Sequence, residues 1–137
     1  MGFEQFGVIS FTGSTKAEQF VEFLKNNDFR GTVCKACGAK FFPPRSDCSK
    51  CLSSEMDWFP ITGEGTLVTF TKAMFAPAGF EKDIPYAMGV AEFADGVKVF
   101  GRIDKSLPDD KIKAGMKVKI RPVNLPDERL SYEFVAA

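Results

Sequence analysis

Hydrophobic and polar residues alternate along much of the second half of the chain, a pattern typical of β-strands with one buried face. In residues 63–71, Val68 and Phe70 are interleaved with threonines. In residues 116–121, apolar side chains alternate with two lysines and an arginine, and Pro122 follows. Because proline lacks a backbone N–H, we expect Pro122 to end this strand.

Three further strands are predicted in the same half of the chain. They cover residues 85–93, residues 97–103, and a last stretch that contains Leu130, Tyr132 and Phe134. Ala-Asp-Gly at 94–96 is a hairpin turn signal. A long loop over residues 72–84 precedes the hairpin, and residues 106–115 contain turn residues with room for a short helical turn. Five such strands predict a small barrel of the OB type, although a sandwich fragment or an SH3-like barrel gives a similar pattern.

The first part of the chain contains one helical pattern. Thr15 and Glu18 have the spacing of a capping box, which predicts the start of a helix at this point. An apolar stripe with helical spacing follows, made of Ala17, Phe20, Val21 and Leu24. The polar run at 26–28 ends the helix. One such helix cannot bury its apolar face alone, so we expect it to pack on the rest of the chain or on a partner.

Four cysteines lie between the helical and the alternating segments, and the chain has no histidine. They form two CxxC pairs, Cys34-Lys-Ala-Cys37 and Cys48-Ser-Lys-Cys51. Each pair can place both sulfurs on one side of a tight turn, and two turns together can enclose a tetrahedral ion. Gly38 suits a turn that needs a positive φ. The pattern predicts one structural zinc ion held by four thiolates.

Other uses of the four cysteines are less consistent with the sequence. Two disulfides need an oxidising compartment, and residues 1–6 lack the basic and apolar regions of a signal peptide. Redox-active CxxC sites usually consist of a single motif at a strand-to-helix turn. Iron bound as in rubredoxin remains chemically open, because tetrahedral sulfur sites accept either metal. We therefore expect a reduced, cytoplasmic protein that binds zinc.

The overall composition is that of an ordinary globular protein with no electrostatic preference for nucleic acid or membrane. Eighteen basic residues balance eighteen acidic ones, and the chain contains fifteen phenylalanines. No apolar run is long enough to span a bilayer. Some of the phenylalanines must form the core, but Phe3, Phe6 and Phe11 fall in an irregular N-terminal arm. We expect them to anchor this arm on the body of the protein or on another subunit.

Several short motifs together resemble one known family. They are the Cys34-x-x-Cys37-Gly knuckle, Phe42-Pro-Pro-Arg45, the Cys48-x-x-Cys51 knuckle, the strand opening at Gly-x-Gly-Thr66, Phe100-Gly-Arg-Ile103, and the stretch from Ile112 to Val118. These motifs resemble the zinc-ribbon plus OB-fold proteins associated with acyl-CoA enzymes. Leu52 departs from that pattern, because the second knuckle has leucine where glycine is usual, and the helical region looks shorter than the family's helical hairpin.

The resemblance implies a mainly β protein with an N-terminal helix, a rubredoxin-like zinc ribbon and a C-terminal five-stranded OB-fold barrel. We expect the arm and helix over residues 1–31, the ribbon over 32–62 and the barrel over 63–137. The resemblance also implies a hetero-oligomer with a thiolase, a thiolase-like aldolase or hydroxymethylglutaryl-CoA synthase. In it, this chain would complete an acyl-CoA site or hold two enzymes together.

The residues agree with such an accessory role because they lack the groups that thiolase chemistry uses. That chemistry needs a cysteine nucleophile and usually a histidine base, whereas all four cysteines are assigned to metal here. No carboxylate pair stands out as an alternative. We predict no catalytic residue in this chain and no acyl transfer by the chain alone.

The most informative loop for partner or acyl-CoA contact is the one over residues 72–84, because loops of this length are uncommon in compact domains and often functional. Phe75 and Phe80 are predicted to line an acyl or pantetheine channel, and Lys72 and Lys82 to meet phosphates of coenzyme A. Arg45, at the tip of the ribbon, is a further predicted contact. A flexible loop with buried aromatic side chains explains the same residues equally well.

A single-stranded nucleic-acid binder is the alternative function, since OB folds and zinc ribbons often serve that purpose. The basic residues that would form a groove around Phe100 are Lys98, Arg102, Lys117, Lys119 and Arg121. A binder of this kind normally carries a net basic charge, and this chain has none. The accessory-subunit interpretation is therefore preferred.

Overall fold

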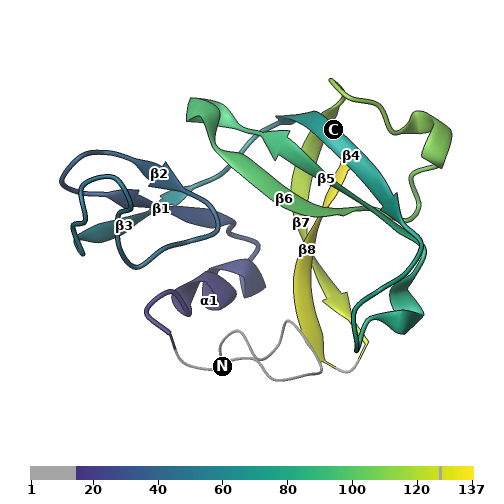
Figure 1. Ribbon diagram of the computed structural model, residues 1–137, viewed down its shortest axis with the longest axis horizontal. Helices are drawn as coiled ribbons and strands as arrows, with labels where there is room; N and C mark the ends of the chain where they lie inside the picture. The colour runs from purple at the N-terminus through teal and green to yellow at the C-terminus, as the bar shows by residue number, and fades with distance from the viewer. Residues whose placement is uncertain (1–14, 127) are drawn as a thin grey trace.

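The structure, a computed structural model, describes residues 15–126 and 128–137. It contains one α-helix, a three-stranded sheet and a closed five-stranded barrel (Figure 1). The elements are α1 (Gln19–Lys25), β1 (Arg30–Cys34), β2 (Lys40–Phe41), β3 (Met56–Pro60), β4 (Gly65–Ala73), η2 (Glu81–Asp83), β5 (Tyr86–Glu92), η3 (Ala94–Gly96), β6 (Lys98–Ile103), η4 (Asp109–Lys111), β7 (Lys117–Leu125) and β8 (Arg129–Ala136). The fold class predicted from the sequence is confirmed.

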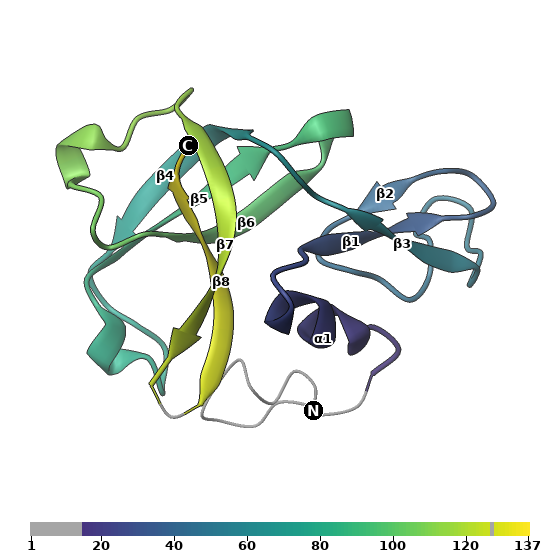
Figure 2. The ribbon, with the colours of Figure 1, turned by 180° about the vertical axis from the view of Figure 1, so that it is seen from behind.

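Helix α1 lies between the ribbon sheet and the barrel, as Figures 1 and 2 show from opposite sides. It buries Phe20, Val21 and Leu24 of the predicted stripe. The predicted capping box does not form. The Thr15 hydroxyl accepts a hydrogen bond from the Ala17 N–H at 3.1 Å, within a preceding turn, and the α-helix begins only at Gln19. A short local hydrogen bond of threonine here competes with the helical cap.

The ribbon is a three-stranded antiparallel sheet in the order β2-β1-β3. The sequence pattern predicted no strand at β3, yet β3 pairs with β1 along the full length of both strands. Gly31 of β1 allows this close packing, since a Cβ atom there would lie 2.5 Å from the Phe41 carbonyl oxygen and 2.9 Å from the Phe59 ring. The ribbon sheet therefore extends to Pro60, the last residue of β3.

The barrel has the strand order β4-β5-β6-β8-β7, and β7 closes it on β4. Every pair is antiparallel except β6 with β8, which is parallel. This is the arrangement of a five-stranded OB barrel. The hairpin between β5 and β6 turns through Asp95 and Gly96, whose φ values are 65° and 72°. The predicted turn at 94–96 is thus correct.

Pro122 does not end its strand, contrary to the prediction. Strand β7 continues to Leu125, and Pro122 pairs with Tyr132 of β8. The other neighbour of β7 is β4, which pairs with it only at Val118 and Lys117. Within residues 15–126 and 128–137, no strand pairs at Pro122 with the edge of β7 that faces away from β8. A proline, which has no N–H to donate, is tolerated at such an edge.

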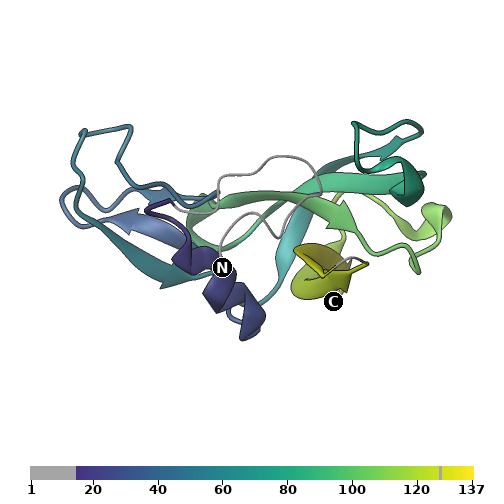
Figure 3. The same ribbon diagram turned by 90° about the horizontal axis from the view of Figure 1, so that it is seen from below.

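The ribbon, the helix and the barrel share one hydrophobic core. Figure 3 places the ribbon sheet and the barrel at opposite ends of the long axis, with α1 between them. Aromatic rings connect the three parts. Phe29 lies 4.9 Å from both Phe42 and Tyr132 between ring centroids, and Phe20 lies 5.6 Å from Phe29. We call these four residues the aromatic cluster. The hydrophobic core therefore extends to the ribbon side through Phe29 and Phe42.

Two predictions remain open. Phe3, Phe6 and Phe11 of the predicted arm lie outside the described residues. The predicted division at residues 31/32 and 62/63 stays a prediction. In the described part of the chain, no helix has the length and the apolar character that crossing a membrane requires.

Candidate metal centre and candidate contact residues

The two CxxC knuckles have the same backbone hydrogen bonds. The N–H of Cys34 donates to Ala39 O and the N–H of Cys48 to Ser53 O, at 2.8 and 2.9 Å. In each knuckle the fourth residue after the first cysteine donates back to that cysteine's carbonyl oxygen. That residue is Gly38 in one and Leu52 in the other, with φ values of 78° and 65°. Leu52 thus adopts a conformation that favours glycine, at the position where the sequence departs from the family's pattern.

The four sulfur atoms converge, as predicted. All four lie within 4.8 Å of one another, with separations of 3.5 Å for Cys34–Cys51 and 3.6 Å for Cys37–Cys48. Tetrahedral zinc with Zn–S bonds of about 2.3 Å holds its sulfurs about 3.8 Å apart. Disulfides would need about 2.05 Å. The donor set and its spacing therefore fit one structural zinc ion.

The backbone around the knuckles favours thiolates at the two buried cysteines. The N–H groups of Cys51 and Lys50 point to the Cys48 sulfur at 3.4 and 3.3 Å, and they lower the pKa of that thiol to about 6. The N–H of Cys37 likewise lowers the pKa of Cys34. At Cys51 the N–H of Ser53 acts in the same sense, but the neighbouring sulfurs and burial raise its pKa to about 12. Metal binding requires deprotonated sulfur, so zinc would supply the positive charge that this cluster lacks.

Arg45 lies beside the ribbon sheet and not at the metal. Its N–H donates to the Thr32 hydroxyl at 2.9 Å, and its guanidinium lies 5.2 Å from the centroid of the Phe41 ring. Thr32 is buried, so this bond fixes the return of the chain after the double proline. The Arg45 side chain stays exposed. Its use as a partner contact stays a prediction.

The two phenylalanines of the long loop have different environments. Phe75 is 85% exposed. Phe80 is half-buried, with the guanidinium of Arg102 at 5.6 Å and that of Arg129 at 5.7 Å from its ring centroid. The structure thus leaves only Phe75 free to meet a ligand or a partner, whereas Phe80 helps to fix the loop on the barrel.

The two lysines predicted to contact phosphates also have different environments. Lys72, on β4, forms an ion pair with Asp109 of η4. Lys82 is exposed on η2. An open hollow of about 660 Å³ lies next to Lys72, lined mainly by apolar side chains that include Met74, Phe75 and Tyr86. The acyl contact predicted for Phe75 would be made in this hollow.

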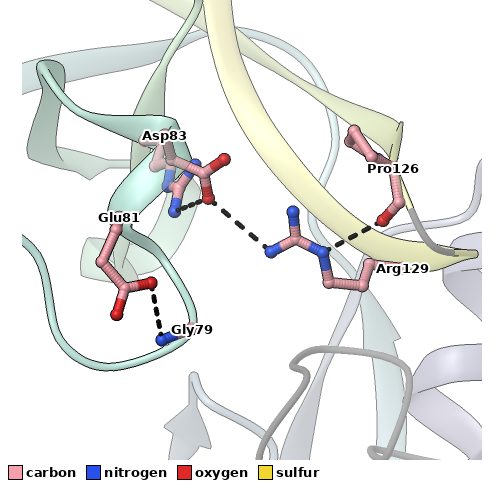
Figure 4. A network of polar contacts seen from close by, with 6 residues as sticks. Gly79, Glu81, Asp83, Pro126 and Arg129 are labelled. Atoms are coloured by element: carbon pink, nitrogen blue, oxygen red, sulfur yellow. Dashed lines mark hydrogen bonds and ion pairs between the residues drawn. The ribbon is translucent and has the colours of Figure 1, made fainter.

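A charged cluster that sequence reasoning did not identify lies under the loop (Figure 4). Asp83 accepts a hydrogen bond from Arg102 Nη2 at 3.1 Å, and Arg129 Nη1 lies 3.6 Å from the same carboxylate oxygen. Arg129 is 7% exposed. The three residues come from η2, β6 and β8, and no local sequence pattern indicates that they meet.

Known families match both parts of the chain. Residues 22–57 match the family described as "ChsH2, rubredoxin-like zinc ribbon domain", and residues 58–122 match "ChsH2, C-terminal OB-fold domain". The two matched stretches are contiguous and together cover most of the chain.

Individual proteins are similar over shorter stretches. A "DUF35 domain-containing scaffold protein" of Methanocaldococcus jannaschii is 34% identical over 90 residues, which are 65% of this chain and 63% of that protein. One of Pyrococcus furiosus is 31% identical over 83 residues, 61% of this chain and 60% of the relative. The "Benzoylsuccinyl-CoA thiolase subunit BbsA" of Thauera aromatica is 28% identical over 75 residues, 55% and 51% of the two chains. The chain thus spans less than two thirds of the length of these relatives.

Two solved structures share the fold. The structure titled "Ltp2-ChsH2(DUF35) aldolase" matches with a TM-score of 0.75 and 23% identity, covering 92% of this chain and 98% of that chain. A DUF35 protein of unknown function from Sulfolobus solfataricus matches with a TM-score of 0.63 and 22% identity, covering 90% and 87%. At these identities the likeness concerns the fold.

Proposed function

Because the chain belongs to the family that joins a ChsH2-type zinc ribbon to a ChsH2-type OB-fold domain (DUF35), we propose that it is a non-catalytic accessory subunit of a thiolase-type acyl-CoA enzyme. In this proposal it stabilises the enzyme and contributes contacts to the acyl-CoA site. The similarity to BbsA, which is named a thiolase subunit, supports a thiolase-like partner. The name of the archaeal relatives, scaffold proteins, supports a role in assembly.

The observation that carries the proposal is the apolar surface along β4 and the residues that follow it. Val68, Phe70, Met74 and Phe75 are 46%, 42%, 66% and 85% exposed. We call these four side chains the β4 surface. Monomeric proteins rarely expose several large apolar side chains together, and such surfaces usually mark a partner contact.

Strand β4 also offers backbone groups to a partner. It pairs with β7 only at Gly65 and Thr66, and the register to β5 shifts between Leu67 and Thr69. Within residues 15–126 and 128–137, no strand pairs with the other edge of β4 beyond Leu67. An open strand edge beside apolar side chains is a recurring feature of protein recognition.

The chain's own residues do not supply thiolase chemistry. It has no histidine, and the four cysteines form the zinc cluster. The catalytic nucleophile and base in this proposal belong to the partner. What this chain contributes is the β4 surface, with Phe75 and the adjoining hollow as the contact to an acyl or pantetheine chain.

Among the described residues, no contact favours the nucleic-acid alternative. Arg121, a residue of the predicted basic groove, forms an ion pair with Glu133. Lys117 donates a hydrogen bond to Thr66. Phe100 is 57% exposed, but these two basic side chains are bound to other residues of the chain, and the net charge of the chain is zero.

The test is co-purification with a co-expressed thiolase-like protein of the same organism. Phe75→Ser, combined with Met74→Ser, removes exposed apolar side chains without changing the core. Since central apolar anchors carry most of the binding energy of an interface, we expect the dissociation constant to rise about tenfold or more. Because the association is apolar, we expect the wild-type complex to survive high salt.

Leu52→Ser is the matched control, because Leu52 is 82% exposed but lies on the second knuckle, away from β4. It should leave complex formation unchanged. Equal binding by the wild type and the double variant would remove the β4 surface from the interface. Absence of any complex with wild-type protein would reject the accessory function itself.

A further inference from the structure

The cluster of Arg102, Arg129 and Asp83 contains more positive than negative charge. Two guanidinium groups share one carboxylate, and the three side chains are 26%, 7% and 13% exposed. Figure 4 shows Arg129 reaching across to Asp83 while its Nε donates to the Pro126 carbonyl at 3.1 Å. Arg129 Nη1 is buried, and none of the described residues forms a hydrogen bond with it. A buried cation without a full partner is costly, so the cluster favours an additional anion.

The neighbouring carboxylates are already engaged. Glu133 pairs with Arg121, and Asp104 accepts hydrogen bonds from the Ser106 hydroxyl and N–H at 2.7 and 3.1 Å. Glu81 accepts the Gly79 N–H at 3.0 Å at the surface of the loop. None of the three contacts Arg129 through a hydrogen bond or ion pair that involves the described residues. The surplus positive charge is thus not neutralised from within the described part of the chain.

A cavity of about 270 Å³ lies next to the cluster. Arg102, Asp83 and Glu133 line it. Lys105 adds a second cation, which is exposed, and Ser131 adds a hydroxyl group. Tyr86 lines this cavity and also the larger hollow beside Met74 and Phe75. The Arg102 guanidinium lies 4.4 Å from the Tyr86 ring centroid, which holds it at the junction of the two spaces.

We propose that this cavity binds the phosphate group of an organic phosphate, with Arg102 and Lys105 as the binding side chains. Planar guanidinium groups recognise phosphate through paired charge-assisted hydrogen bonds. When Arg102 turns to the phosphate, Asp83 is left to Arg129, whose Nη1 then gains the partner that it lacks. The bound anion thereby neutralises the surplus charge and keeps the loop over residues 74–85 in place.

The position of Tyr86 between the two spaces indicates an elongated ligand with a phosphorylated end and an apolar arm. The phosphorylated end would occupy the Arg102 cavity, and the arm would extend past Tyr86 to Phe75. A coenzyme A thioester has this shape and charge. The phosphate site stands on the geometry alone, whereas the choice of coenzyme A as its source rests on the proposed function.

Isothermal titration calorimetry on the zinc-loaded full chain tests the proposal. The probes are coenzyme A, adenosine 3′,5′-bisphosphate, inorganic phosphate and pantetheine, all at one ionic strength. We expect both nucleotide probes to bind, coenzyme A more tightly than the bisphosphate, and pantetheine to bind far more weakly. Hydrogen bonds to charged groups contribute about 1.5–3 kcal/mol. Arg102→Gln and Lys105→Gln should therefore each weaken coenzyme A binding by about tenfold or more.

Lys98→Gln is the matched control, because Lys98 is an exposed cation on the same strand that does not line the cavity. It should change the affinity less than about twofold, since only the long-range charge is lost. Equal weakening by Lys98→Gln, or no heat from any phosphate compound at millimolar concentration, overturns the site. Binding of inorganic phosphate as tight as that of coenzyme A keeps the site and rejects coenzyme A as its source. These outcomes do not depend on whether the thiolase-like partner binds.

Discussion

The cysteine end of the ribbon and the interior of the barrel are stabilised by different means. In the barrel, Leu67, Val99, Val118 and Phe134 are at most 1% exposed and belong to one continuous core. At the cysteine end the fully buried side chains are the sulfurs of Cys34 and Cys48. Alternating apolar residues specify the first region, and spaced metal ligands specify the second. The comparison shows that a chain of this length can stabilise one part of its fold by burying apolar surface and another part by coordinating a metal ion.

The aromatic cluster joins the two regions, so the difference between them is not a boundary between independent domains. Phe20 comes from α1, Phe29 and Phe42 from the ribbon side, and Tyr132 from β8. An ion pair between Lys40 of β2 and Asp95 of the β5–β6 hairpin adds a second contact. Substitutions confined to one region should therefore show which part of the fold depends on metal coordination and which part depends on apolar packing.

The largest effect is expected from Cys48→Ser. It removes a buried ligand whose sulfur also accepts two backbone N–H groups. Because metal binding supplies the folding free energy of such a site, zinc content should fall from about one ion per chain to a small fraction. Elemental analysis measures zinc, and the amide NMR signals of residues 34–53 report the loss of ordered structure.

Lys50→Ala is the control for this change, since Lys50 is exposed on the same knuckle and its backbone N–H is retained. Barrel signals should persist in Cys48→Ser if packing alone holds that region. Full zinc retention by Cys48→Ser would contradict the four-thiolate assignment.

A smaller effect, in the opposite region, is expected from Phe134→Ala. Phe134 is fully buried and stacks on Phe93 with a centroid distance of 6.5 Å. Truncating a buried phenylalanine typically costs about 3–5 kcal/mol of unfolding free energy. Urea unfolding followed by circular dichroism measures this loss, while zinc content in native buffer should stay near that of the wild type. Loss of zinc in folded Phe134→Ala would mean that the two regions are not separable.

The smallest effect is expected from Tyr132→Phe, in the aromatic cluster between the two regions. The Tyr132 hydroxyl donates to the Phe100 carbonyl at 2.7 Å, so its removal should cost about 1 kcal/mol at neutral pH. Burial raises the pKa of Tyr132 above its usual range. A raised pKa means that the folded chain holds this proton more tightly than the unfolded chain. The corresponding stability is complete below the unfolded pKa of about 10 and is lost as the pH rises above it.

The difference in unfolding free energy between the wild type and Tyr132→Phe should therefore shrink as the pH rises past about 10. Urea midpoints measured on both proteins at neutral and alkaline pH give this difference directly. A gap that is constant with pH would show that Tyr132 does not titrate differently in the two states.

The sequence predicted the elements whose pattern is local. Period-two alternation located β4 to β8, and the CxxC spacing located the sulfur cluster, because both signals lie within a few residues. Strand β3 was missed because its residues alternate poorly, with Trp58 and Phe59 both partly buried. The continuation of β7 through Pro122 depends on an unpaired edge, which only the barrel topology reveals.

The candidate contact residues were less predictable for the same reason. Phe75 and Phe80 look alike in the sequence, but Phe80 is held by two arginines that come from distant strands. The meeting of Asp83 with Arg102 and Arg129 follows from the parallel pairing of β6 with β8 and from the path of the loop. Such contacts depend on the closed barrel and leave no trace in local spacing.

The aromatic cluster also sets how freely the two ends of the molecule can pivot. A hinge between ribbon and barrel would have to separate Phe29 from Tyr132 and expose both rings to water, which costs apolar burial. We therefore expect the knuckles and the β4 surface to keep a fixed distance and angle. A partner that contacts both Arg45 of the ribbon and the β4 surface would then lose little orientational entropy on binding, so the rigidity of the subunit itself favours a tight assembly.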